Sequence, residues 1–157
     1  MTELCVTAID PCRLEAVRAA GKDEHGNEFR PYGALGWEPL RCCLRVAGEG
    51  ERIALISYAA FTGQSPWAEV GPVYVHAGEC GGYPDSSQLP AELRTGPRIL
   101  RSYHADETLD YDDIEYVAGG QDIEPALREL LDRPNVALVH VRAAKTQCFI
   151  YEVRPTG

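Results

Sequence analysis

Residues 39–58 read PLRCCLRVAGEGERIALISY, and this stretch decides the fold class. Apolar and polar side chains largely alternate over residues 40–46, which is the period of a half-buried strand. Residues 52–58 form a second β-rich run, and the intervening AGEGE at 47–51 is rich in turn-forming residues. The pattern therefore predicts an antiparallel β-hairpin in this segment.

Further strands are predicted on either side of the hairpin, from β-branched and alternating runs bounded by turn signals. They cover residues 5–9, 70–76, 99–104, 114–117, 136–142 and 148–153. Two helices interrupt these strands. The first begins after Asp10, an N-cap residue followed by Pro11, and ends before Gly21. The second follows Asp122 and carries an apolar stripe that includes Leu127.

Strands joined by hairpin-length connections, with helices at irregular positions, do not give the alternation of a parallel βαβ fold. The sequence predicts an α+β fold with a largely antiparallel sheet of about seven or eight strands and two helices. A chain of 157 residues fits a single domain over residues 1–157.

The charge balance and the apolar runs exclude some partners. The chain has 15 Lys and Arg against 24 Asp and Glu, a net charge of −9. Nucleic acid is not expected as a partner, because binding it depends on neutralising phosphates with basic residues. No membrane association is expected either, since the apolar runs are too short to cross a bilayer. Residues 107–124 hold seven of the acidic residues and no Lys or Arg, which predicts a solvated strand edge.

The chain has six cysteines and no C-x-x-C pair. Its first ten residues, MTELCVTAID, lack the basic cluster and apolar segment of a signal peptide, so a cytoplasmic location is predicted. Free thiols are the expected state in that compartment. Cys42 and Cys43 are adjacent on the predicted strand, where their side chains point to opposite faces, and a disulfide between them is not expected.

Three strings in the strand-rich part carry a family resemblance. They are PLRCCLR at 39–45, SPWAEVGPVYVHA at 65–77 followed by Cys80 and Tyr83, and VHVR at 139–142. Together they resemble the bacterial family called domain of unknown function 1203, over about residues 35–155. The resemblance implies a single-domain bacterial protein and carries no established activity.

His76 and Cys80 are the leading candidates for reactivity. His76 ends a predicted strand and Cys80 follows in a glycine-rich loop, where an imidazole beside a thiol can lower the pKa of the thiol and make it nucleophilic. Tyr83 is a candidate proton donor, and His140 is a second acid/base candidate. The alternative is that these side chains only pack and form hydrogen bonds in their loop.

Three arginines are predicted to bind the substrate. Arg41 and Arg45 share one face of the predicted 40–46 strand, and Arg142 lies on another strand; guanidinium groups recognise carboxylates and phosphates through paired hydrogen bonds. Trp37 and Trp67, in two loops, are expected to form apolar walls. The alternative for the arginines is ion pairing with nearby glutamates such as Glu51.

The leading hypothesis is a protein that binds a small anionic molecule, and whether it is also an enzyme stays open. One alternative is a non-enzymatic sensor or interaction module whose tryptophan loops meet a protein partner. The other is a structural zinc protein. No cofactor is predicted; zinc is the alternative, with ligand types that suit it at Cys43, His76, Cys80, His140 and Cys148.

Overall fold

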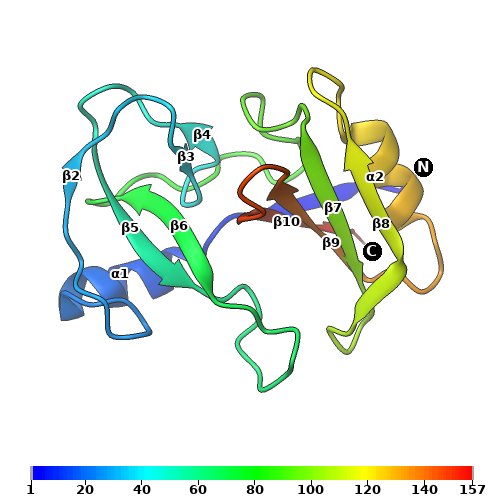
Figure 1. Ribbon diagram of the computed structural model, residues 1–157, viewed down its shortest axis with the longest axis horizontal. Coiled ribbons are helices and arrows are strands. Elements are labelled where there is room, and N and C mark those ends of the chain that lie inside the picture. Colours follow the sequence, from blue (N-terminus) through cyan, green and yellow to red (C-terminus); the bar gives the residue numbers. More distant parts are fainter. Residues whose placement is uncertain (1, 157) are drawn as a thin grey trace. The chain divides into compact units, whose positions relative to one another are not determined.

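The computed structural model describes residues 2–156, which form ten strands and two helices (Figure 1). The strands make two five-stranded sheets, and the chain divides into two compact units. The central unit is Ala8–Pro84. The terminal unit comprises the residues up to Thr7 and those from Asp85 onward. No helix in the described residues is long and apolar enough to cross a membrane.

The sheet of the terminal unit has the order β1-β10-β9-β7-β8, and every neighbouring pair is antiparallel. In that order the strands are Leu4–Thr7, Phe149–Pro155, Leu138–Ala143, Arg98–Tyr103 and Leu109–Val117. Helix α2, Glu124–Leu131, contacts β8 and β9 and buries Leu127, Leu130 and Leu131. The second predicted helix is therefore present, with its apolar stripe in the core.

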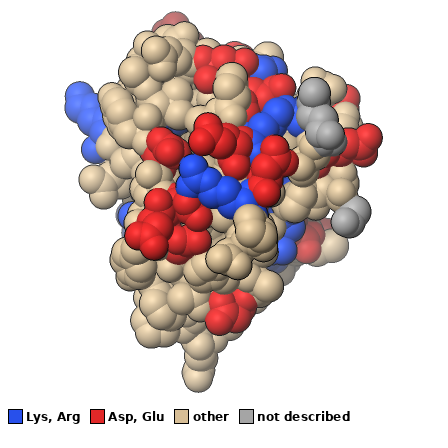
Figure 2. Space-filling model, turned by 90° about the vertical axis from the view of Figure 1, so that its right-hand side faces the viewer, with Lys and Arg blue, Asp and Glu red and all other residues tan. Residues whose placement is uncertain are grey.

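The acidic run at residues 107–124 is partly neutralised in the terminal unit. Arg94 forms ion pairs with Asp122 and Glu124, and Arg133 pairs with Asp113. Figure 2 shows acidic and basic side chains mixed on one face of the molecule. These arginines lie outside residues 107–124. The composition of that segment alone therefore does not reveal the ion pairs that offset its negative charge.

The sheet of the central unit has the order β2-β5-β6-β3-β4. In that order the strands are Tyr32–Gly33, Arg52–Tyr58, Gly71–His76, Pro39–Leu40 and Arg45–Val46, and only the β3–β6 pair is parallel. Helix α1, Pro11–Ala20, buries Leu14 and Val17 in the same hydrophobic core as Ile53 and Val75. This helix begins and ends as predicted. The Asp10 side chain accepts from the Cys12 amide at its start, and Gly21 adopts a φ of 69° at its end.

The predicted α+β class is confirmed, but the single sheet of seven or eight strands is replaced by ten strands in two sheets over the described residues. The strand predicted at 40–46 is wrong. Residues 41–44 form a turn between β3 and β4, closed by the Leu44 amide donating to the Leu40 carbonyl at 2.9 Å. The alternation of the sequence does not correspond to alternating burial, because Arg41 is buried together with Leu40, Cys42 and Leu44, and only Cys43 among residues 40–44 is half-buried.

The predicted hairpin is wrong for the same reason. β4 pairs with β3, whereas β5 pairs with β2 and β6. The two short strands on either side of the turn satisfy each other's backbone groups, which leaves β5 to pair elsewhere. The expectation of one domain over the whole chain stays a prediction.

Candidate metal centre

Four side chains of the central unit bring their metal-binding atoms together. Cys42 and Cys43 come from the turn between β3 and β4, His76 ends β6, and Cys80 follows in the next loop. Their ligand atoms all lie within 4.8 Å of one another. The His76 Nδ1 atom is 3.2 Å from the Cys42 Sγ and 3.7 Å from the Cys43 Sγ.

The turn is what places both neighbouring cysteines at one site. On a strand, successive side chains point to opposite faces, so only one of the two would reach a common centre. Here residues 41–44 curve back, with Leu44 at a φ of 58° in the left-handed region. Both sulfur atoms therefore face the same imidazole nitrogen of His76.

The orientation of His76 is set by a carboxylate on its other side. Its Nε2 lies 2.7 Å from the Glu51 Oε2 and 3.1 Å from the Arg45 Nη2. A carboxylate only accepts, so we assign the proton to Nε2, from which the ring donates to Glu51. This tautomer is inferred from the partners, and it leaves the lone pair of Nδ1 facing the sulfurs. A histidine that binds a metal through one nitrogen is commonly held by a carboxylate on the other.

Glu51 is itself held in place. Its carboxylate accepts from Arg45 at 2.9 Å and from the Gly48 amide at 2.8 Å. These hydrogen bonds, that of Arg45 foremost, hold the pKa of Glu51 well below its usual range. The carboxylate therefore stays ionised and can accept from His76 over the physiological pH range.

The two thiols of the turn differ in acidity. A hydrogen bond from Cys42 lowers the pKa of Cys43, and the nearby Arg45 guanidinium lowers it further against the opposing effect of burial. The same hydrogen bond, together with burial, raises the pKa of Cys42. The Cys42 sulfur also accepts from the His76 amide at 3.3 Å. Cys43 is thus the sulfur most readily present as a thiolate, the form that binds metals.

The distances suit a tetrahedral ion. Zinc bonds of about 2.3 Å to sulfur and about 2.0–2.1 Å to nitrogen place tetrahedral ligand atoms about 3.6–3.8 Å apart. The two sulfur–nitrogen distances at His76, 3.2 and 3.7 Å, lie close to that spacing. Three sulfurs and one imidazole can therefore hold a zinc ion with small adjustments of side-chain angles.

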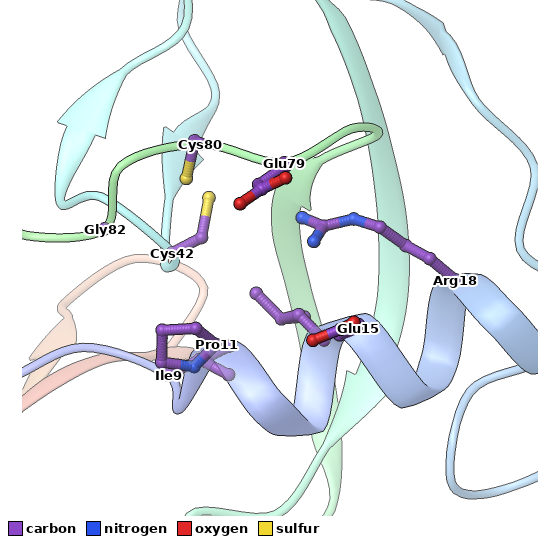
Figure 3. A pocket seen from close by; sticks show the side chains of 9 residues that line it. Ile9, Pro11, Glu15, Arg18, Cys42, Glu79, Cys80 and Gly82 are labelled. Atoms are coloured by element: carbon purple, nitrogen blue, oxygen red, sulfur yellow. The ribbon is translucent and has the colours of Figure 1, made fainter.

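A cavity of about 290 Å³ adjoins the cluster (Figure 3). Cys42 and Cys80 form part of its wall. The other lining residues come from α1, the segment before it and the loop after β6: Ile9, Pro11, Leu14, Glu15, Arg18, Glu79 and Gly82. One edge of the cluster thus faces a space large enough for a small molecule.

The structure brings together some of the residues predicted from the sequence and separates others. His76, Cys80 and Cys43 lie in the cluster. His140 lies in the terminal unit, where it is buried between the rings of Tyr103 and Phe149. There its Nε2 is 2.9 Å from a Glu152 carboxylate oxygen, on the paired strand.

Two further predicted residues also lie outside the cluster. Cys148 belongs to the terminal unit, and its thiol donates to the Thr146 carbonyl at 3.7 Å. Tyr83 is half-buried in the loop after Cys80, three residues beyond the sulfur ligand. Neither side chain joins the group of ligand atoms found in the described residues.

The three predicted substrate arginines have different surroundings. Arg41 is buried and donates to the Pro39 carbonyl at 2.6 Å. Arg45 pairs with Glu51, as the alternative interpretation expected. Arg142, in the terminal unit, donates to the Gln147 carbonyl at 2.9 Å. They do not share a strand face, because Arg41 lies in the turn that replaced the predicted strand.

The tryptophan loops do not line the cavity beside the cluster in the described residues. Trp67 is half-buried in the loop between β5 and β6. Trp37 is exposed and lies edge-on to Tyr74, with ring centroids 5.7 Å apart. Its loop is organised by the buried Glu38 carboxylate, which accepts from the backbone amides of Leu35, Gly36 and Trp37.

Substitution of Glu38 by Gln is expected to lower the stability of the central unit at pH 7 by about 1–3 kcal/mol, because an amide nitrogen would face a backbone N–H group. Burial raises the pKa of Glu38, but the backbone amides outweigh it and hold the pKa below 4.5. Stability from this group is therefore present at neutral pH and lost as the pH falls below that value. Urea unfolding at pH 7 and pH 3.5 measures the difference in free energy of unfolding between wild type and Glu38→Gln. This difference should be smaller at pH 3.5.

The exposed Glu28 offers a control for that experiment, since its carboxylate bonds only an exposed arginine among its described contacts. Glu28→Gln should change stability by less than about 0.5 kcal/mol at either pH. Equal effects of the two substitutions at pH 7 would contradict the role assigned to Glu38.

Three residues that matter to the site were missed at the sequence level. Cys42 was assigned to the wrong face of a strand. Glu51 was considered only as an ion-pair partner. Arg18 has no motif that distinguishes it, although its position four residues after Leu14 places it on the same helix face. That spacing is the signal that would have directed Arg18 toward the core side of α1.

A family model described as "Protein of unknown function (DUF1203)" matches residues 37–154. All four cluster residues, and Glu51 with them, lie inside the matched segment. Helix α1, which supplies Glu15 and Arg18 to the cavity, precedes it. Comparison with curated proteins and with solved structures gave no match.

Proposed function

The chain belongs to the DUF1203 family of proteins of unknown function, as its sequence strings predicted, and we therefore propose a function from the chemistry of the site itself. The proposed function is binding of one Zn²⁺ ion by Cys42, Cys43, His76 and Cys80. The observation that carries it is the placement of His76, with Nε2 on Glu51 and Nδ1 toward two sulfurs.

The donor set favours zinc over other common ions. Three thiolates and an imidazole are soft or borderline ligands, which suit Zn²⁺ and not Mg²⁺ or Ca²⁺. Four protein ligands complete a tetrahedral shell, which is typical of zinc that stabilises a fold. Such an ion would join the β3–β4 turn and the loop after β6 to the end of the sheet.

Small-molecule binding is the second candidate function, and the cavity beside Cys42 and Cys80 supports it. A ligand there would contact the sulfurs that also serve the metal. The thiol chemistry expected of Cys80 would then compete with metal binding for the same atom. We propose that the ligand carries a negatively charged group, because Arg18 lines this cavity.

A cytoplasmic location is part of the proposal. All six cysteines are free, and a cluster of three close thiols stays reduced most readily in a reducing compartment. The net charge of −9 supports the expectation that nucleic acid is not a partner. A protein partner at the exposed Trp37 remains the proposal for an interaction module.

Protein purified without chelators is expected to contain one zinc ion per chain, measured by elemental analysis. Cys43→Ser and His76→Ala should each bring zinc below a tenth of an equivalent, since each removes a ligand. Cobalt(II) replacing zinc in the wild type should give intense thiolate charge-transfer absorption. That measurement does not depend on the folding of any variant.

Cys12→Ser is the matched control, because Cys12 is an exposed free cysteine in the same unit and should leave the zinc content unchanged. Glu51→Gln keeps all four ligands and should weaken zinc binding about 10–100-fold, as loss of a carboxylate that orients a ligand does. Wild-type protein that takes up neither zinc nor cobalt would end the proposal.

A further inference from the structure

The cavity beside the cluster has two chemically different ends. In the view of Figure 3 Arg18 and Glu15 lie on one side of the cavity, the sulfur and apolar groups lie on the other, and the Glu79 carboxylate lies between the sulfurs and Arg18. The charged residues are Glu15, Arg18 and Glu79. The residues at the opposite end are Ile9, Pro11, Cys42 and Cys80. A ligand that matches this division has a polar head and an apolar or sulfur-containing tail.

Arg18 is held so that it can receive an anionic group. One terminal nitrogen donates to the His76 carbonyl at 3.1 Å, which anchors the guanidinium above α1. Figure 3 shows the terminal nitrogens directed toward the cavity. The Arg18 Nε is buried and has no hydrogen-bond partner in the described residues. The guanidinium therefore has hydrogen bonds left to donate, and a carboxylate is the group that its geometry fits.

The two glutamates require a positive charge in the same ligand. Glu15 and Glu79 are exposed, line the cavity and form no ion pair with Arg18 in the described residues. Two carboxylates against one guanidinium leave this end with a net charge of −1. A zinc ion with three thiolates and one neutral imidazole adds a further −1. A simple anion would meet net repulsion here, whereas an added ammonium group offsets it.

We propose that the cavity binds a small zwitterion of the α-amino-acid type. Its carboxylate lies on Arg18, its ammonium group on Glu15 and Glu79, and its side chain toward the apolar end. This inference rests on the proposed small-molecule function and narrows its ligand class. A cavity of about 290 Å³ lies at the lower end of the range for ligand sites and suits a molecule of this size.

Three compounds that share the branched side chain of leucine test the inference on the zinc-loaded chain. L-Leucine carries both charges, 4-methylpentanoate lacks the ammonium group, and 3-methylbutylamine lacks the carboxylate. Titration followed by amide chemical shifts should show leucine binding at least tenfold more tightly than either analogue, because each analogue loses one charge-assisted contact.

Variants should separate the two contacts. Arg18→Gln should weaken the binding of leucine and of 4-methylpentanoate at least tenfold and leave the affinity for 3-methylbutylamine unchanged. Glu79→Gln should weaken the binding of leucine and of 3-methylbutylamine and should not weaken the binding of 4-methylpentanoate. Arg30→Gln and Glu28→Gln alter an exposed ion pair of the same unit and serve as controls that should leave all three affinities unchanged. Zinc content is measured for every variant, so loss of the metal is not mistaken for loss of a contact.

The outcomes distinguish the zwitterion site from the proposed zinc binding and from a site for simple anions. Equal affinity for leucine and 4-methylpentanoate would overturn the zwitterion and leave a site for simple anions. Absence of binding by all three compounds to zinc-loaded protein would also overturn it, with the zinc proposal intact. Absence of zinc would contradict the metal proposal, which the elemental analysis registers separately.

Discussion

Removal of zinc by a strong chelator is expected to unfold the central unit at neutral pH. An ion that binds only the folded state stabilises it by about 4 kcal/mol when its free concentration is a thousand times the dissociation constant. The segments it would join, the β3–β4 turn and the loop after β6, contain little regular structure. Both tryptophans lie in this unit, and Trp67 is half-buried, so a red shift of its emission measures the unfolding of the unit.

Adding back one equivalent of Zn²⁺ should restore the emission spectrum, whereas Mg²⁺ should not, since it avoids thiolate ligands. The amide resonances of β9 and β10 give a separate reading for the terminal unit. Chelated protein with unchanged tryptophan emission and an unchanged urea midpoint would contradict a stabilising role for the ion.

Gly96→Ala is expected to destabilise the terminal unit by about 4 kcal/mol, the upper end for single substitutions. A Cβ at this position would lie within 3.0 Å of the backbone carbonyls of Val117 and Ala118. Gly96 also donates to the Gln121 carbonyl at 2.8 Å and accepts from Gly120 at 3.1 Å. Because all these neighbours are backbone, none can rotate away. Urea unfolding followed by circular dichroism gives the free energy of unfolding.

Gly63→Ala is the matched control. No atom lies within 4 Å of a Cβ built there, and its backbone does not have a positive φ. It should change stability by less than about 1 kcal/mol. If Gly96→Ala also changes the free energy of unfolding by less than about 1 kcal/mol, residue 96 does not approach the carbonyls of residues 117–118 this closely.

Local signals determined several elements correctly. Helix α1 begins and ends where Asp10, Pro11 and Gly21 predict, because capping and backbone preferences act within a few residues. β5 likewise covers the predicted residues 52–58. The failure at 40–46 has a physical reason: a buried turn and a strand can show the same alternation, and only pairing partners distinguish them.

Some residues of the candidate site could be predicted from the sequence and others could not. His76 and Cys80 stood out because a histidine and a cysteine flank the end of one strand. His140 had the same chemical type, but its partner is Glu152, directly opposite on the neighbouring strand. Glu51 could be identified only as an ion-pair partner, since no motif links it to the cluster, and the spacing of Arg18 from Leu14 indicates its helix face but not the cavity that it lines.

The amino-acid sequence by itself determined the α+β class, the family and the limits of α1, because these depend on composition and on neighbours along the chain. Tertiary structure alone decided that Cys42 and Cys43 share a centre with His76 and Cys80. That convergence depends on the turn at 41–44 and on the pairing of β3 with β6. Contacts between segments more than thirty residues apart are set by packing of the whole unit, which no local pattern records.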